Sequence, residues 1–107
     1  MRMTISVLAL ALVAGCNQAD DRVRFDGEVF RGKASKVKDN PRAFTAWVSP
    51  VAASIDGARE AARYEGTKYC IAAYGTSDIE WSVSPDTEDL TAQIDGNQLN
   101  VAGECQP

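Results

Sequence analysis

The sequence of 107 residues contains no histidine and no Cys-x-x-Cys motif. Without histidine, the Ser-His-Asp and Cys-His arrangements of hydrolases are excluded, and the commonest transition-metal ligand is missing. A Gly-x-Ser-x-Gly motif, a phosphate-binding glycine loop and an EF-hand loop are also lacking. The sequence therefore indicates no catalytic residue, no metal site and no cofactor, and we expect a non-enzymatic protein.

Long apolar runs are lacking as well. No stretch reaches the roughly 18 apolar residues that a membrane-spanning helix needs. The length fits one domain. The formal net charge of −4, together with the export signal described next, argues against nucleic acid as a partner.

The first sixteen residues have a pattern of their own. Met1-Arg2-Met3 supplies a positive charge, residues 5–14 form a short apolar run, and Val13-Ala14-Gly15-Cys16 ends it. This order resembles the signal peptide and lipobox of bacterial lipoproteins. The resemblance implies that residues 1–15 are removed and that Cys16 carries the lipid.

The residues after Cys16 bear on where the protein is held. In lipoproteins of two-membrane bacteria, Asp after the lipidated cysteine favours retention in the inner membrane. Asn17 is not Asp, so the resemblance implies an outer-membrane anchor facing the periplasm. Residues 16–22 are polar and read as a short tether, which spans about 20 Å at most. We expect the globular domain to cover residues 23–107.

Cys70 and Cys105 remain once Cys16 is assigned to the anchor. Exported proteins fold under oxidising conditions, so an even pair of cysteines favours a disulfide. A bridge across about 35 residues would contribute roughly 3–4 kcal/mol in the chain-entropy model. A redox pair is the alternative, but the sequence has no Cys-x-x-Cys motif and no histidine that could lower a thiol pKa. We therefore expect a structural disulfide.

The domain shows strand patterns on both sides of one helical pattern. The helix is expected from Ile55 to Glu65, with Ser54 as N-cap and Gly66 just past its end. Before it, strands are expected at 23–25, 29–30, 32–38 and 43–49, with turns at 26–27 and 39–41.

After the helix, residues 67–74, which include Cys70, are expected to form the central strand. Further strands are expected at 79–83, 90–94 and 99–105, and residues 95–98 form a hairpin signal. This order predicts an α+β fold, in which a small antiparallel sheet of about five to seven short strands is covered on one face by a single helix. Phe25-Asp26-Gly27, Tyr69-Cys70-Ile71 and residues 74–81 resemble small envelope lipoproteins without an assigned activity, and this resemblance supplies no functional residue.

The two tryptophans differ in their settings. Trp81 alternates in step with Ile79 and Val83, which predicts a core position. Trp47 points opposite to Phe44 on its strand. Either the helix covers the second face of the sheet, or Trp47 is exposed and contacts a membrane interface or a partner.

Charge is segregated along the chain. Residues 22–42 hold seven basic side chains, whereas residues 76–107 hold seven acidic ones and no Lys or Arg. If these segments are neighbours, their charges pair across strands and contribute little. If they lie apart, Arg31, Lys33, Lys36 and Lys38 could face anionic head groups or a partner.

Carboxylate side chains are the remaining candidates for catalysis or metal binding. Asp78 and Glu80 could form a pair on one face of a strand, but the pattern places them toward solvent. The acidic loop of Asp86, Glu88 and Asp89 could bind calcium only weakly. We therefore expect an anchored envelope protein with a binding, assembly or structural role toward an unidentified envelope protein; the alternative is a periplasmic small-ligand binder or carboxylate-based hydrolase.

Overall fold

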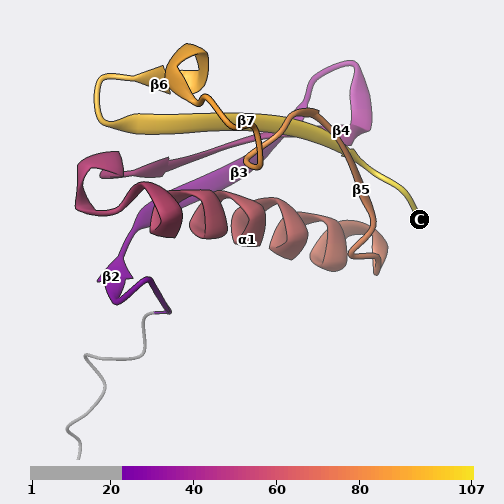
Figure 1. Ribbon diagram of the computed structural model, residues 1–107. Helices are drawn as coiled ribbons and strands as arrows, with labels where there is room; N and C mark the ends of the chain where they lie inside the picture. The colour runs from indigo at the N-terminus through magenta and orange to yellow at the C-terminus, as the bar shows by residue number, and fades with distance from the viewer. Residues whose placement is uncertain (1–22) are drawn as a thin grey trace, which may run out of the picture.

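The computed structural model describes residues 23–107, so the expected signal peptide, Cys16 and the tether lie outside the described residues. An antiparallel sheet carries one long helix on one face (Figure 1), which confirms the α+β fold. The strands are β1 (Arg24–Phe25), β2 (Glu28–Val29), β3 (Arg31–Val37), β4 (Asn40–Ser49), β5 (Ile79–Val83), β6 (Ile94–Asp95) and β7 (Gln98–Cys105). The helix α1 spans Ile55–Tyr74, and short 3-10 turns η2 (Val51–Ala53) and η3 (Thr91–Gln93) complete the domain.

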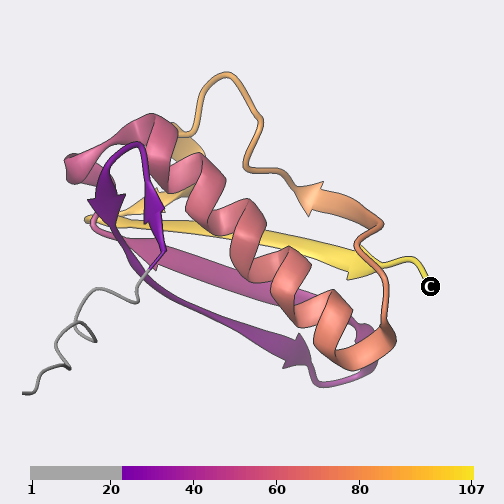
Figure 2. The ribbon, with the colours of Figure 1, turned by 90° about the horizontal axis from the view of Figure 1, so that it is seen from below.

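The main sheet has the strand order β3-β4-β7-β5, and β6 also pairs with β7. Every pairing is antiparallel, so β4 and β5 run in the same direction with β7 between them. The helix connects β4 to β5 and crosses the sheet diagonally (Figure 2). The β1–β2 hairpin is separate from the sheet and packs against α1.

The core lies between α1 and one face of the sheet, here called the inner face. On the helix, small residues recur every four positions at Ala58, Ala62, Gly66 and Cys70, and all are buried. The sheet contributes the larger apolar side chains, with Phe44 fully buried. The ring of Phe44 lies 5.5 Å from those of Tyr69 and Trp81, so Trp81 faces the core as its pattern predicts.

The helix is longer than the sequence indicates. Ser54 caps it as expected, because its side chain accepts a hydrogen bond from the backbone N–H of Gly57. The helix does not end at Gly66 but continues to Tyr74, and Gly75 at φ 70° terminates it. The strand expected at 67–74 is therefore wrong. Gly66 lies inside the helix because the Phe44 and Trp81 rings occupy the space that a side chain would need.

Two details of the C-terminal half also differ from the expectation. Residues 90–94 are not one strand: Leu90 is buried in the core, η3 follows, and only Ile94–Asp95 pairs with β7. The register of β5 shifts between Trp81 and Val83, so Val83 pairs with Ala102. This irregularity takes Val83 off the face that it was expected to share with Trp81, since cross-strand partners lie on one face.

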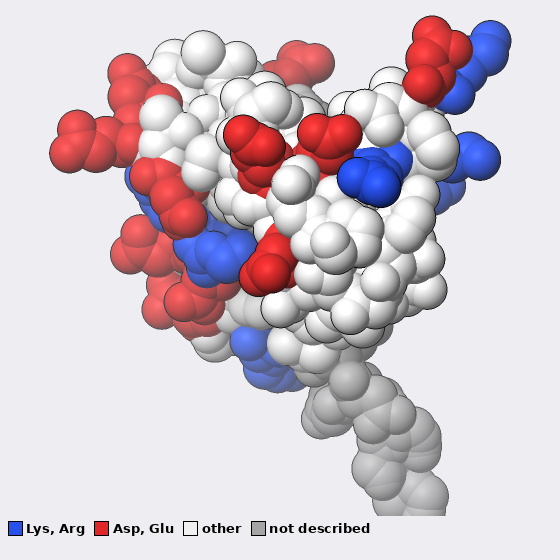
Figure 3. All heavy atoms as spheres, turned by 90° about the vertical axis from the view of Figure 1, so that its right-hand side faces the viewer, with Lys and Arg blue, Asp and Glu red and all other residues white. Residues whose placement is uncertain are grey.

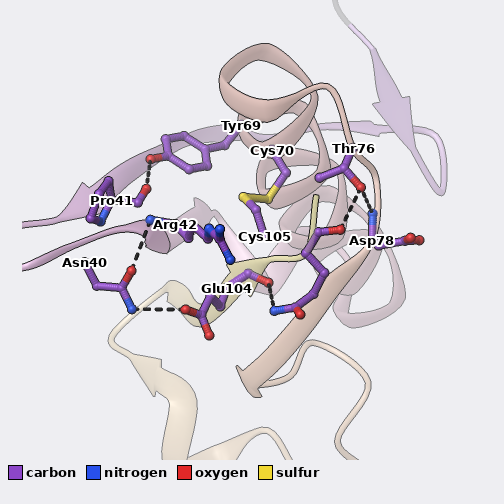
Figure 4. Close-up of a disulfide and its surroundings, with 10 residues drawn as sticks. Asn40, Pro41, Arg42, Tyr69, Cys70, Thr76, Asp78, Glu104 and Cys105 are labelled. Atoms are coloured by element: carbon purple, nitrogen blue, oxygen red, sulfur yellow. Dashed lines mark hydrogen bonds between the residues drawn. A yellow bond between two sulfur atoms is a disulfide. The ribbon is translucent and has the colours of Figure 1, made fainter.

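The predicted disulfide is present, and it joins α1 to β7 (Figure 4). The Cα atoms of Cys70 and Cys105 are 5.5 Å apart, and both residues are fully buried. Cys70 belongs to the helix rather than to a strand. Around the bridge, the Tyr69 hydroxyl donates to the carbonyl of Pro41, and Thr76 donates to the carbonyl of Gln106. The bridge thus holds the last strand against the end of the helix.

Candidate functional site

The face of the sheet opposite α1, here called the outer face, carries Trp47. The side chains of Phe44, Ala46 and Val48 on β4 are buried on the inner face. Trp47 alternates with them and is only partly buried. Its cross-strand partners are Lys33 on β3 and Asn100 on β7. Of the two readings left open by the sequence, the structure selects a Trp47 that the helix does not cover.

A hollow of about 400 Å³ lies on this outer face, between the sheet and the segment that contains η3 and β6. In Figure 1 this segment rises above β7, on the side away from α1. Trp47 and Thr45 from β4 meet Asn100 and Ala102 from β7, and Val83 closes the hollow from β5. Ala92, Gln93, Ile94 and Asp95 form the opposite wall. We call this hollow the Trp47 groove.

Amide side chains fix the wall of the Trp47 groove. The Gln93 side chain donates to the carbonyls of Ser84 at 2.9 Å and Asn100 at 3.4 Å, and the Asn100 side chain donates to the carbonyl of Gln93 at 3.4 Å. The side-chain oxygen of Asn100 accepts from the side-chain amide of Gln98 at 2.9 Å. Because these polar groups bond to one another, the groove presents mainly the apolar surfaces of Trp47 and its neighbours.

The segment leading into η3 is tied to the helix. Arg59 on α1 donates to the carbonyls of Pro85, Thr87 and Glu88, at 3.0, 2.5 and 3.2 Å. At the start of η3, Asp89 accepts from the hydroxyl and the backbone N–H of Thr91. These two bonds lower the pKa of Asp89 from its ordinary value of 3.8. The groove wall is thus positioned by contacts from both sides.

The four basic residues singled out by the sequence do not share one face. Arg31 and Lys33 lie on the outer face, with Arg31 donating to the Ser49 hydroxyl at 3.3 Å. Lys36 pairs with Phe44 and so lies toward the helix side, and Lys38 is in the turn between β3 and β4. Within the described residues, no ion pair involves the three lysines. Arg31 and Lys33 thus share the outer face with the Trp47 groove without lining it, and Lys33 is the cross-strand partner of Trp47.

Two acidic residues lie side by side near the opposite edge of the sheet. Glu80 on β5 pairs directly with Glu104 on β7, and the Asn40 side chain donates to Glu104 at 3.1 Å. These three residues line an open hollow on the outer face. The structure thus brings Glu80 beside Glu104 rather than beside Asp78. Figure 3, which faces the right-hand side of Figure 1, shows acidic side chains at the left and centre, with basic ones between them and at the right.

Two of the three carboxylates in the acidic loop before η3 bond to other residues of the domain. Asp86 pairs with Arg63 of α1, and Asp89 bonds to Thr91 as described above. Within residues 23–107, no group of three or more acidic or cysteine side chains is placed to hold a metal ion. No helix in this part of the chain is both long and apolar enough to cross a membrane.

Of the residues that line the Trp47 groove, sequence reasoning identified only Trp47. Val83 was assigned to the core and residues 90–94 to a strand, so the wall could not be foreseen. The available signal was Gln93 and Asn100, two amides that a strand pattern leaves without partners.

Comparison of the chain with protein-family models, curated proteins and solved structures found no match.

Proposed function

We propose that this chain is a non-enzymatic, lipid-anchored domain of the bacterial cell envelope, held through Cys16, that binds a protein partner in the Trp47 groove. The groove carries the proposal, because a partly exposed tryptophan in a hollow with fixed walls is typical of a contact site. The lipobox pattern of residues 13–16 supports the anchor.

The place where the chain enters the domain favours a protein partner over the membrane. Val23 lies on the α1 side of the molecule, where it shares a hollow with Tyr64 and Lys68. The β1–β2 hairpin that follows packs there too, with the ring of Phe25 at 5.4 Å from that of Tyr64. A tether of six residues reaches about 20 Å at most. The anchor therefore holds the α1 side toward the membrane and leaves Trp47 facing away.

Site-specific photo-crosslinking in cells tests the partner. A photoreactive amino acid replaces Thr45, an exposed residue of the groove, and in a matched control it replaces Ile71, which is 52% exposed on α1. We expect a protein adduct from position 45 that Trp47→Ala abolishes, and none from position 71. Adducts with lipid at position 45 would assign the groove to the membrane, and an adduct that survives Trp47→Ala would contradict the proposed site.

The anchor is tested separately. We expect Cys16→Ser to abolish acylation, so that the protein accumulates as the unprocessed precursor or as a soluble form. Metabolic labelling with a fatty-acid analogue, followed by membrane fractionation, measures both. A mature Cys16→Ser variant that still requires detergent for extraction would show that another feature holds the protein at the membrane.

A further inference from the structure

The two edges of the main sheet carry charges of opposite sign. One edge is β3, with exposed Arg31 and Lys33 on its outer face. The other edge includes β5, where Glu80 is exposed and lies beside Glu104. Within the described residues, neither Lys33 nor Glu80 forms an ion pair or a side-chain hydrogen bond. Edge strands also present unpaired backbone N–H and C=O groups, which can pair with another chain.

The directions of the edge strands are compatible with pairing between copies. Three successive antiparallel pairings separate β3 from β5, so these two strands run in opposite directions. A second copy in the same orientation would therefore place its β3 antiparallel to the β5 of the first. Lys33 and Glu80 are both on the outer face, since their cross-strand partners are Trp47 and Glu104.

We propose that copies of this chain join edge to edge, with β3 of one copy pairing with β5 of the next and Lys33 opposite Glu80. In this register, Ala34 faces Ile79 on the inner side. Apolar side chains therefore meet on the inner face, and opposite charges meet on the outer face. Pairing of like edges is disfavoured, because β3 with β3 brings the basic side chains together and β5 with β5 brings the glutamates together. The charges thus select a head-to-tail contact.

The helices leave room for this contact. The helix lies mainly over β4, β7 and β3 and makes few contacts with β5. Strands are spaced about 4.8 Å apart, so copies that repeat every four strands are separated by roughly 19 Å. Packed helices need only about 8–10 Å. Sheet twist of about 20–25° per strand turns successive copies well away from each other, so copies anchored in one flat membrane form pairs rather than long rows.

Crosslinking with a carbodiimide tests the proposal, because this reagent joins an amine to a carboxylate that touches it. The purified full-length chain in mild detergent is treated over a range of concentrations. We expect a covalent dimer, and peptide mapping by mass spectrometry should locate the link between Lys33 and Glu80. Lys33→Glu and Glu80→Lys each remove a group that the reagent needs, so their dimer fraction is measured without it, by size-exclusion chromatography; each should lower the dimer fraction roughly tenfold, since attraction across the ladder becomes repulsion.

A charge swap separates this contact from unspecific association. Mixing the Lys33→Glu and Glu80→Lys proteins should restore the dimer, because each supplies the edge that the other lacks. Lys38→Glu makes the same charge change in the β3–β4 turn, outside the paired register, and should leave the dimer unchanged. A chain that stays monomeric at every concentration, or a mixture that fails to recover the dimer, would overturn the proposal. The lysines would then serve only to keep the edge unpaired.

Discussion

Replacement of Gly66 by alanine sets two physical effects against each other. Glycine inside a helix costs about 1 kcal/mol relative to alanine, so helix propensity alone predicts that Gly66→Ala stabilises the protein. In the structure, an added methyl group would lie 2.7 Å from Cη2 of Trp81 and 2.8 Å from Cε2 and Cζ of Phe44. Carbon atoms prefer separations of about 3.5–4.0 Å, and the Phe44 ring is fully buried and cannot move aside.

Overpacking of this kind costs about 1–3 kcal/mol, so we expect Gly66→Ala to lower the free energy of unfolding by up to about 2 kcal/mol. For a domain of this size, the corresponding loss in Tm is several degrees, measured by thermal and urea unfolding. The difference between Glu60→Ala and Glu60→Gly, at an exposed position of the same helix, calibrates the propensity effect. A stabilised Gly66→Ala protein would refute the close packing of α1 on the sheet.

Three further perturbations probe the disulfide and the groove wall. Replacing Cys70 and Cys105 together by alanine should lower the unfolding free energy by about 2–5 kcal/mol, measured by urea unfolding; a loss below 1 kcal/mol would contradict its structural role. Asp89 has a folded-state pKa below 3.8, so the stability that its ionised carboxylate contributes is present above that pH and is lost as pH falls through the folded pKa. The Thr91 amide resonance should therefore titrate with a midpoint below 3.8 in NMR spectra. A midpoint above 3.8 would refute the two hydrogen bonds. Arg59→Ala removes three charged donors, each worth about 1–2 kcal/mol when partly exposed; hydrogen exchange should become faster across residues 84–93 and remain unchanged in β3.

The error over residues 66–74 follows from competing local signals. Glycine is common just after a helix, so Gly66 suggested a helix end, and the run from Tyr69 to Tyr74 contains aromatic residues typical of strands. The deciding feature was the interval of four between small residues, from Ala58 through Gly66 to Cys70. That interval continues across the supposed break and marks a helix face that can approach a sheet closely. Tertiary packing against Phe44 thus overrode the local preference for a helix end.

The strands of the sheet were predictable because their alternation is regular. Leu99, Val101, Gly103 and Cys105 share one face of β7, as their spacing indicates, and all are buried. The groove wall was not predictable, because it depends on a register shift after Trp81 and on the contacts of Arg59 with a loop. Such long-range contacts leave no periodic trace in the sequence. The predicted site therefore contained Trp47 but no other residue that lines the groove.

The constraints that close the core also determine which side chain of β4 faces outward. Successive residues of a strand point to opposite faces, so a slip of one residue would bury Trp47 and expose Phe44. The pairing of Phe44 with Gly103 prevents this slip, because a side chain at Gly103 would lie 3.2 Å from Cζ of Phe44. The Cys105 disulfide holds β7 in place two residues farther along. Trp47 is therefore presented on the outer face by the same contacts that stabilise the fold, which gives a binding site a rigid support.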